Sequence, residues 1–122
     1  MTTVVDYSDK WVRSDTGANI HTKSYNYCSC IKIGSICTVS ITGHVSGTWE
    51  SNDTHPWIIS NIPRPKNGRI EFSGWALRAN VAYPMRFLID AVKTGTIKPW
   101  YNSQVFSDPD TFSFCVTYVT TD

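Results

Sequence analysis

Charge is scarce in this sequence, and long apolar runs are missing from it. Only 17% of its 122 residues are charged, and the net charge is +1, whereas ordinary domains are about 25% charged. The basic surface by which proteins hold nucleic acid is therefore missing, and we expect no nucleic-acid partner. The sequence has no uncharged apolar stretch of roughly 18 residues, so we expect no membrane insertion.

Targeting and helix signals are also absent. The first residues, MTTVVDYSDKWV, lack the charged start and apolar stretch of a signal peptide. We therefore expect a reducing compartment, in which cysteines remain free thiols. No capped amphipathic segment occurs, and Pro84 interrupts any long helix, so only residues 75–79 and 87–93 could form a helical turn or two.

What the sequence does contain is a hydrophobic content of 41% in 122 residues, enough for the core of one domain, residues 1–122. Its clearest local signal is SICTVSITGHV, where Cys37, Val39, Ile41 and Val45 alternate with polar residues. A period of two predicts a strand with two unlike faces. The segment YNYCSCIKI alternates as well, and Gly34-Ser35 between the two predicts a hairpin with a type II′ turn.

The expected register of this hairpin pairs Ile33 with Ile36. Cys28, Cys30 and Cys37 then share one face with Val39 and Ile41. The other face is also substantially apolar and carries Tyr25, Tyr27, Ile31, Ile33 and Ile36. Antiparallel sheets usually leave one face to solvent, so a second apolar face predicts that a partner subunit covers it.

Further strands are expected at residues 55–62, 69–79, 83–92 and 111–119. The last of these places Phe112, Phe114, Val116 and Tyr118 on one face and Cys115 on the other. Trp75 lies within such a strand, and we expect it in the core. Short strands separated by turn residues predict an all-β antiparallel fold, either a β-sandwich or jelly roll or a small β-barrel.

The sequence gives little support for a catalytic or a metal-binding site. Cys28, Cys30 and Cys37 are spaced along flat strands, whereas zinc sites use cysteines at a turn, so we expect buried thiols and no metal or cofactor. No nucleophile or phosphate-binding motif occurs. Asp108 and Asp110 flank Pro109, which predicts a turn rather than a catalytic carboxylate pair. We therefore expect no enzyme activity.

The aromatic residues indicate binding. The chain has five tryptophans, and two segments combine aromatic with polar residues: GTWESNDTHPW and KPWYNSQ. A flat ring beside amides and carboxylates complements a sugar, which presents C–H faces rimmed by hydroxyls. The alternative is that these rings seal the ends of the fold or a subunit contact. The residues expected to bind ligand are Trp49, Asp53, His55, Trp57, Trp100 and Tyr101.

Several of these motifs also carry a resemblance to a known family. A tyrosine before IKIGSICTVSITGHVSG, then WIISNIPRP, and later GWAL and the terminal TYVTTD, together resemble the C-terminal head domains of bacteriophage tail-fibre and baseplate proteins. The resemblance implies a β-sandwich or jelly-roll homotrimer that recognises saccharides on the host cell wall. It also implies a place in the virion, at the tail tip, after synthesis in the bacterial cytoplasm. Unlike a whole fibre protein, this sequence has no stalk before the head, which leaves trimerisation to the head.

Three functions remain open from the sequence. The first is non-catalytic binding of host cell-surface saccharide. The second is a structural or assembly module that docks to other phage tail or baseplate proteins through its aromatic loops. The third is an enzyme that degrades polysaccharide.

Overall fold

The computed structural model describes residues 3–6, 12–13, 22–45, 48–49, 58–91, 95–102 and 104–121. These residues form antiparallel strands and no helix, so none of them belongs to a helix able to span a membrane. The predicted all-β antiparallel class is confirmed. The strands are β1 (Val4–Asp6), β2 (Val12–Arg13), β3 (Thr22–Ile33), β4 (Ile36–Val45), β5 (Thr48–Trp49), β6 (Ile59–Ile62), β7 (Arg69–Arg78), β8 (Val81–Ala91), β9 (Gly95–Pro99), β10 (Phe106–Ser107) and β11 (Thr111–Val119).

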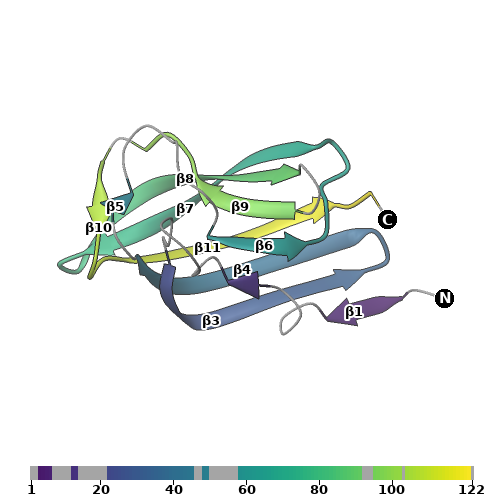
Figure 1. Ribbon diagram of the computed structural model, residues 1–122, viewed down its shortest axis with the longest axis horizontal. Coiled ribbons are helices and arrows are strands. Elements are labelled where there is room, and N and C mark those ends of the chain that lie inside the picture. The colour runs from purple at the N-terminus through teal and green to yellow at the C-terminus, as the bar shows by residue number, and fades with distance from the viewer. Residues whose placement is uncertain are drawn as a thin grey trace.

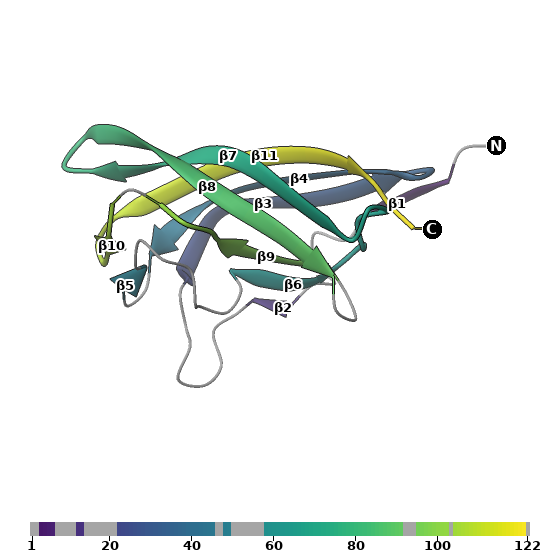
Figure 2. The ribbon, with the colours of Figure 1, turned by 90° about the horizontal axis from the view of Figure 1, so that it is seen from above.

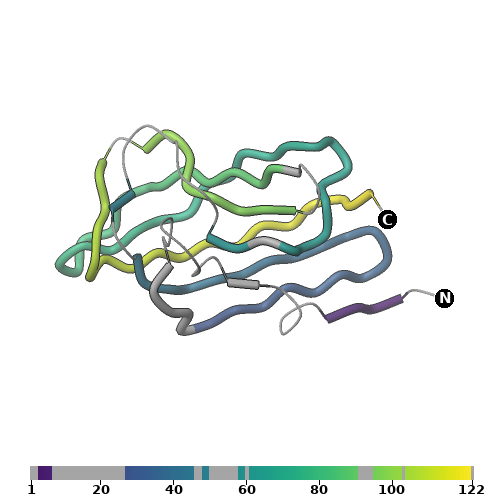
Figure 3. Tube along the Cα trace, viewed as in Figure 1, coloured from purple at the N-terminus to yellow at the C-terminus, as the bar shows by residue number. Residues whose placement is uncertain are grey.

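Most of these strands form one curled sheet, a half-barrel, in the order β1-β3-β4-β11-β7-β8-β9-β6-β2. Figure 1 shows the sheet face on, and Figure 2 shows β9, β6 and β2 passing beneath the layer of β8, β7, β11, β4 and β3. Strands β5 and β10 pair separately at one end. The N-terminal strand β1 and the C-terminus lie at the other end, beside the β3–β4 turn (Figure 3).

The β3–β4 hairpin has the register that the sequence predicts. Ile33 pairs with Ile36, and Cys30 pairs with Val39. Gly34 has a φ of 59°, as expected for the first central residue of a type II′ turn. Cys30, Cys37, Val39 and Ile41 face the core, and Ile33 and Ile36 lie exposed on the outer face.

The sequence allows helical turns at residues 75–79 and 87–93, but the described residues 75–79 and 87–91 belong to the hairpin of β7 and β8. Residues 75–78 and 87–91 are strand, and Arg78 pairs with Val81 across a two-residue turn. Ala79 and Asn80 both have positive φ angles, 49° and 66°. Two left-handed central residues characterise the type I′ turn, whose twist matches that of the paired strands.

The core lies inside the curl of the sheet and is rich in aromatic rings. Phe87 of β8 packs against Phe72, Phe112 and Phe114, with centroid distances of 5.5, 6.3 and 4.7 Å. Isoleucines of β6 and β9 close the same cluster from below. Asn61, at a φ of 71°, interrupts the β6 register, so that Ile59 and Ile62 are both buried although they lie three residues apart.

Trp75 is not part of this core, contrary to the prediction. Its side chain is 58% exposed, because alternation along β7 turns Phe72 and Ala76 inward and Ser73, Trp75 and Leu77 outward. The bulk of a tryptophan is easily mistaken for a core signal, but its position in the strand decides which face it occupies.

Gly74 gives a test of the β7–β11 junction. A Cβ at this position would lie 2.5 Å from the Ser113 carbonyl oxygen and 2.8 Å from Phe114 Cβ. We predict that Gly74→Ala lowers the free energy of unfolding by about 3 kcal/mol, because neither neighbour can move aside cheaply. Urea denaturation followed by tryptophan fluorescence measures this loss.

Gly68→Ala is the matched control. A Cβ there meets no atom within 4 Å, although the φ of 80° is unfavourable for alanine. The expected loss is about 1 kcal/mol, from backbone conformation alone. Equal losses for the two variants would show that the β7–β11 contact is not tight.

Candidate functional site

The segment that follows β9 continues alongside β8, beyond the pairing of Phe87 with Pro99. The Trp100 backbone N–H donates a hydrogen bond to the Arg86 carbonyl oxygen at 3.0 Å. The Arg86 N–H in turn donates to Asn102 Oδ1 at 2.7 Å. Residues 100–102 are thereby attached to a strand at both ends, although no regular ladder continues there.

Tyr101, between these two anchors, projects into solvent. Its side chain is 50% exposed, and its φ of 43° lies in the left-handed region. This backbone conformation costs a non-glycine residue roughly 1 kcal/mol or more and persists only where the surroundings impose it. The Trp100 ring meets the Tyr101 ring edge to face, with centroids 4.6 Å apart and planes at 79°. The phenol is therefore held on a rigid support.

Trp100 serves as that support. The Arg69 guanidinium lies 4.5 Å from the centroid of its ring, and Lys98 Nζ lies 5.2 Å away. Both cations favour the negative face of an indole. Leu88, the outward residue of β8 between Glu71 and Lys98, is only 1% exposed. The contacts of Arg69 and Lys98 thus hold the Trp100 ring in place, and the exposed ring of Tyr101 is the one available to a ligand.

A cavity of about 340 Å³ adjoins Tyr101, a volume within the usual range of ligand pockets. Ser73, Pro84, Arg86 and Asn102 line it together with Tyr101. Arg86 Nη2 donates to Glu71 Oε1 at 2.6 Å, and both side chains are about half exposed, so this ion pair contributes little to stability. The cavity therefore combines an aromatic ring with a hydroxyl, an amide and the guanidinium of Arg86.

Asn102 is the most unusual residue of this cavity. It is only 7% exposed, and the hydrogen bond to Oδ1 fixes the orientation of its amide. Its Nδ2 is buried and has no acceptor among the described residues. A buried donor without an acceptor costs about 1–3 kcal/mol.

The six residues expected to bind ligand have different outcomes. Trp100 and Tyr101 lie together at the cavity, Trp100 as support and Tyr101 as the exposed ring. Asp53, His55 and Trp57 lie outside the described residues. The prediction for Trp49 is corrected, since it is 0% exposed and packs against Phe87 and Phe112, so its indole has no free face.

Ser73, Pro84 and Arg86 were missed by sequence reasoning. The alternation of Ile70, Phe72 and Gly74 in β7 did carry a signal for Ser73, since it places this residue on the outer face. No comparable signal joins Pro84 and Arg86 to Asn102, because that contact depends on how the chain leaves β9.

The cysteines do not form a metal centre in the part of the chain that the structure describes. Cys30 Sγ and Cys37 Sγ lie 3.7 Å apart in the core. A hydrogen bond from the Cys30 thiol would stabilise the Cys37 thiolate, which lowers the pKa of Cys37 and raises that of Cys30. Burial raises the pKa of Cys28 to about 12. Cys115 is exposed on the outer face.

Asp110 has the structural role that the sequence predicts for it. Its Oδ2 accepts hydrogen bonds from the Ser107 backbone N–H at 3.0 Å and from Arg78 Nη2 at 3.1 Å. These bonds close the turn between β10 and β11 and connect it to the end of β7. Asp110 thus stabilises the turn that leads into β11.

Known proteins add no information about this site. No protein-family model, curated protein or solved structure matches the chain. The chemistry of the site therefore rests on its own geometry, which provides a supported aromatic ring, a buried amide donor and a partly exposed ion pair.

The burial of the cysteines predicts their order of alkylation. We expect iodoacetamide at pH 8 to modify exposed Cys115 first and Cys30 and Cys37 only on unfolding. Cys28 should react slowly, with a rate that rises about tenfold per pH unit, since the thiolate is the reactive form and a pKa of about 12 keeps it scarce.

Mass spectrometry of peptides after timed quenching measures each rate. Cys115→Ser, as the control, should remove the fast phase. Modification of Cys30 or Cys37 at the rate of Cys115 would contradict the packing described above.

Proposed function

We propose that this domain binds saccharide without catalysis, as a receptor-binding head at the tip of a phage tail fibre or baseplate. The observation that carries the proposal is the cavity beside Tyr101, where an exposed ring adjoins the polar side chains of Ser73, Arg86 and Asn102. The tail-tip location rests on the resemblance of the β3–β4 hairpin and the Ile59–Pro65 element to phage head domains.

Sugar chemistry fits this cavity in two ways. The face of a pyranose is a flat array of C–H groups that packs on an aromatic ring. Its hydroxyls both donate and accept hydrogen bonds, so they can bond to the Ser73 hydroxyl and to the Arg86 guanidinium, which both line the cavity. Because Tyr101 is already held in place, little conformational entropy is lost on binding.

A homotrimeric, jelly-roll-like head is the assembly that we propose. Val4, Ile33, Ile36 and Val119 pair in register across β1, β3, β4 and β11, and all four are exposed. Such a contiguous apolar row suits a subunit contact. The row lies at the end of the sheet near the chain termini, whereas Tyr101 is beside the middle of β8, so assembly and ligand binding can use separate surfaces.

Tyr101→Ala tests the saccharide site. Titration with purified bacterial cell-wall polysaccharides should show binding by the unaltered chain and a loss of affinity of about tenfold in the variant, as for one aromatic contact. The melting temperature should be unchanged, because the ring is half exposed. Incubation with the bound polysaccharide should release no new reducing ends.

Tyr27→Ala is the matched control. Tyr27 is another exposed tyrosine, on β3 and outside the cavity, and its replacement should leave affinity unchanged. Equal losses in the two variants, or no binding by the unaltered chain, would refute the saccharide site. Release of reducing ends would favour an enzyme instead.

The apolar row gives a separate test of assembly. Ile33→Lys should convert the trimer to monomers in sedimentation velocity, because it places a charge in the proposed contact. Val81→Lys, which alters an equally exposed residue at the β7–β8 turn, should leave the trimer intact. A monomeric unaltered chain at micromolar concentration would contradict the trimer. Dissociation on Tyr101→Ala would favour the alternative of a structural module that uses its aromatic loop as interface.

A further inference from the structure

Trp75 is the largest exposed side chain on the outer face that the Tyr101 cavity does not use. It stands near the middle of that face, with Ser113 of β11 and Pro84 of β8 as its direct neighbours. Its indole is 58% exposed. Exposed tryptophans on a rigid strand are common elements of binding surfaces, because they offer large apolar area at little entropic cost.

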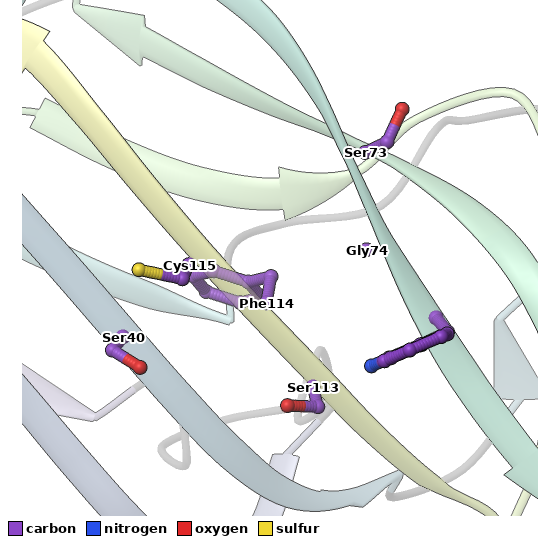
Figure 4. A pocket seen from close by; sticks show the side chains of 7 residues that line it. Ser40, Ser73, Gly74, Ser113, Phe114 and Cys115 are labelled. Atoms are coloured by element: carbon purple, nitrogen blue, oxygen red, sulfur yellow. The ribbon is translucent and has the colours of Figure 1, made fainter.

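Two depressions flank Trp75. The first, of about 480 Å³, lies where β7 and β11 separate, since their pairing covers only Trp75–Leu77 and Thr111–Ser113. Figure 4 shows Ser73 and Gly74 on β7, Ser113 and Cys115 on β11, and Ser40 on β4 around it. The second, of about 370 Å³, lies on the other side of Trp75 between Thr42 and Leu77.

These depressions adjoin the Tyr101 cavity. Ser73 lines both the Tyr101 cavity and the first depression. Trp75 and Ser113 line both depressions beside the indole. The three hollows therefore lie side by side on the outer face, and we call them together the track. From β8 to β4 it crosses three strand spacings, roughly 14 Å, and Tyr101 extends it beyond β8.

The lining changes in character along the track. Among the lining residues that the structure describes, the only charged side chain is that of Arg86, at the Tyr101 end. The two depressions beside Trp75 are lined by apolar residues and by the hydroxyls of serine and threonine, with no charged side chain. Thr42 and Ser113 share a hydrogen bond at 3.0 Å, which orients both hydroxyls. Neutral groups that can exchange hydrogen bonds with hydroxyls suit this surface better than ions do.

From this geometry we infer that the ligand is a linear, neutral oligosaccharide of several sugar units that lies over the outer face from Tyr101 past Trp75 to the depression between Leu77 and Thr42. Tyr101 and Trp75 act as two stacking platforms, and the hydroxyls of Ser73, Ser113 and Thr42 beside them receive the sugar hydroxyls. The inference rests on the proposed saccharide function and adds the length and charge of the ligand to it.

Chain length provides the test. The probe is the polysaccharide that binds in the titration above, cut by mild acid hydrolysis and fractionated from monosaccharide to hexasaccharide. Affinity should rise with length by about tenfold or more in total, since a second aromatic platform is engaged only by the longer chains. Trp75→Ala should remove this rise and leave the affinity for the shortest fragment unchanged, whereas Tyr101→Ala should weaken every fragment.

Cys115 supplies a second readout. Because it lines the first depression and is exposed, a bound hexasaccharide should slow its alkylation, whereas a monosaccharide should not. Val81→Ala, at an exposed residue outside the three hollows, is the control and should change neither affinity nor protection.

The outcomes separate this inference from the proposed function. Binding that does not depend on length, or that survives Trp75→Ala at every length, would overturn the track and leave the Tyr101 site standing. Dissociation of the assembly by Trp75→Ala without any change in binding would make this surface a subunit contact and overturn the inference. No binding at any length would overturn the saccharide function itself.

Discussion

The packing of aromatic rings around Phe87 is the contact on which the rest of the fold depends. Four rings from β5, β7 and β11 surround it, those of Trp49, Phe72, Phe112 and Phe114. Gly74 passes so close to this cluster that a Cβ would lie 2.7 Å from a carbon of the Phe87 ring. The cluster thus joins the small β5–β10 pair to the large sheet and fixes how tightly β7 and β11 meet.

The aromatic packing around Phe87 also decides which side chains lie on the outer face. Once Phe72 and Phe114 fill the inside, alternation turns Ser73, Trp75 and Cys115 outward. Strands β7 and β11 separate beyond their short ladder, which leaves a hollow on the outer face with a rigid rim. A surface built on paired strands holds its side chains more precisely than a loop does, and the proposed ligand track lies on such a surface.

Much of the fold could be predicted from the sequence, and less of the site. The register of Ile33 with Ile36 and the inward face of β11 followed directly from period-two alternation. The same rule, extended from Phe72, places Trp75 on the outer face. The burial of Trp49 could not be predicted in this way, because the two residues of β5 are too few to show a period. Of the site, the sequence indicated Trp100 and Tyr101 but not their neighbours on β7 and β8.

Local spacing by itself determined the alternating strands and the turn at Gly34, because side-chain direction in a strand and the φ angle of a turn depend only on near neighbours. Tertiary structure alone decided that Trp49 pairs with Phe106 and that Asn102 reaches Arg86. Those contacts join residues far apart in the chain, and they form only where the packing of the whole core outweighs the entropy of closing the intervening loops. The binding surface belongs to this second class, since its residues come from separate strands that the curled sheet brings together.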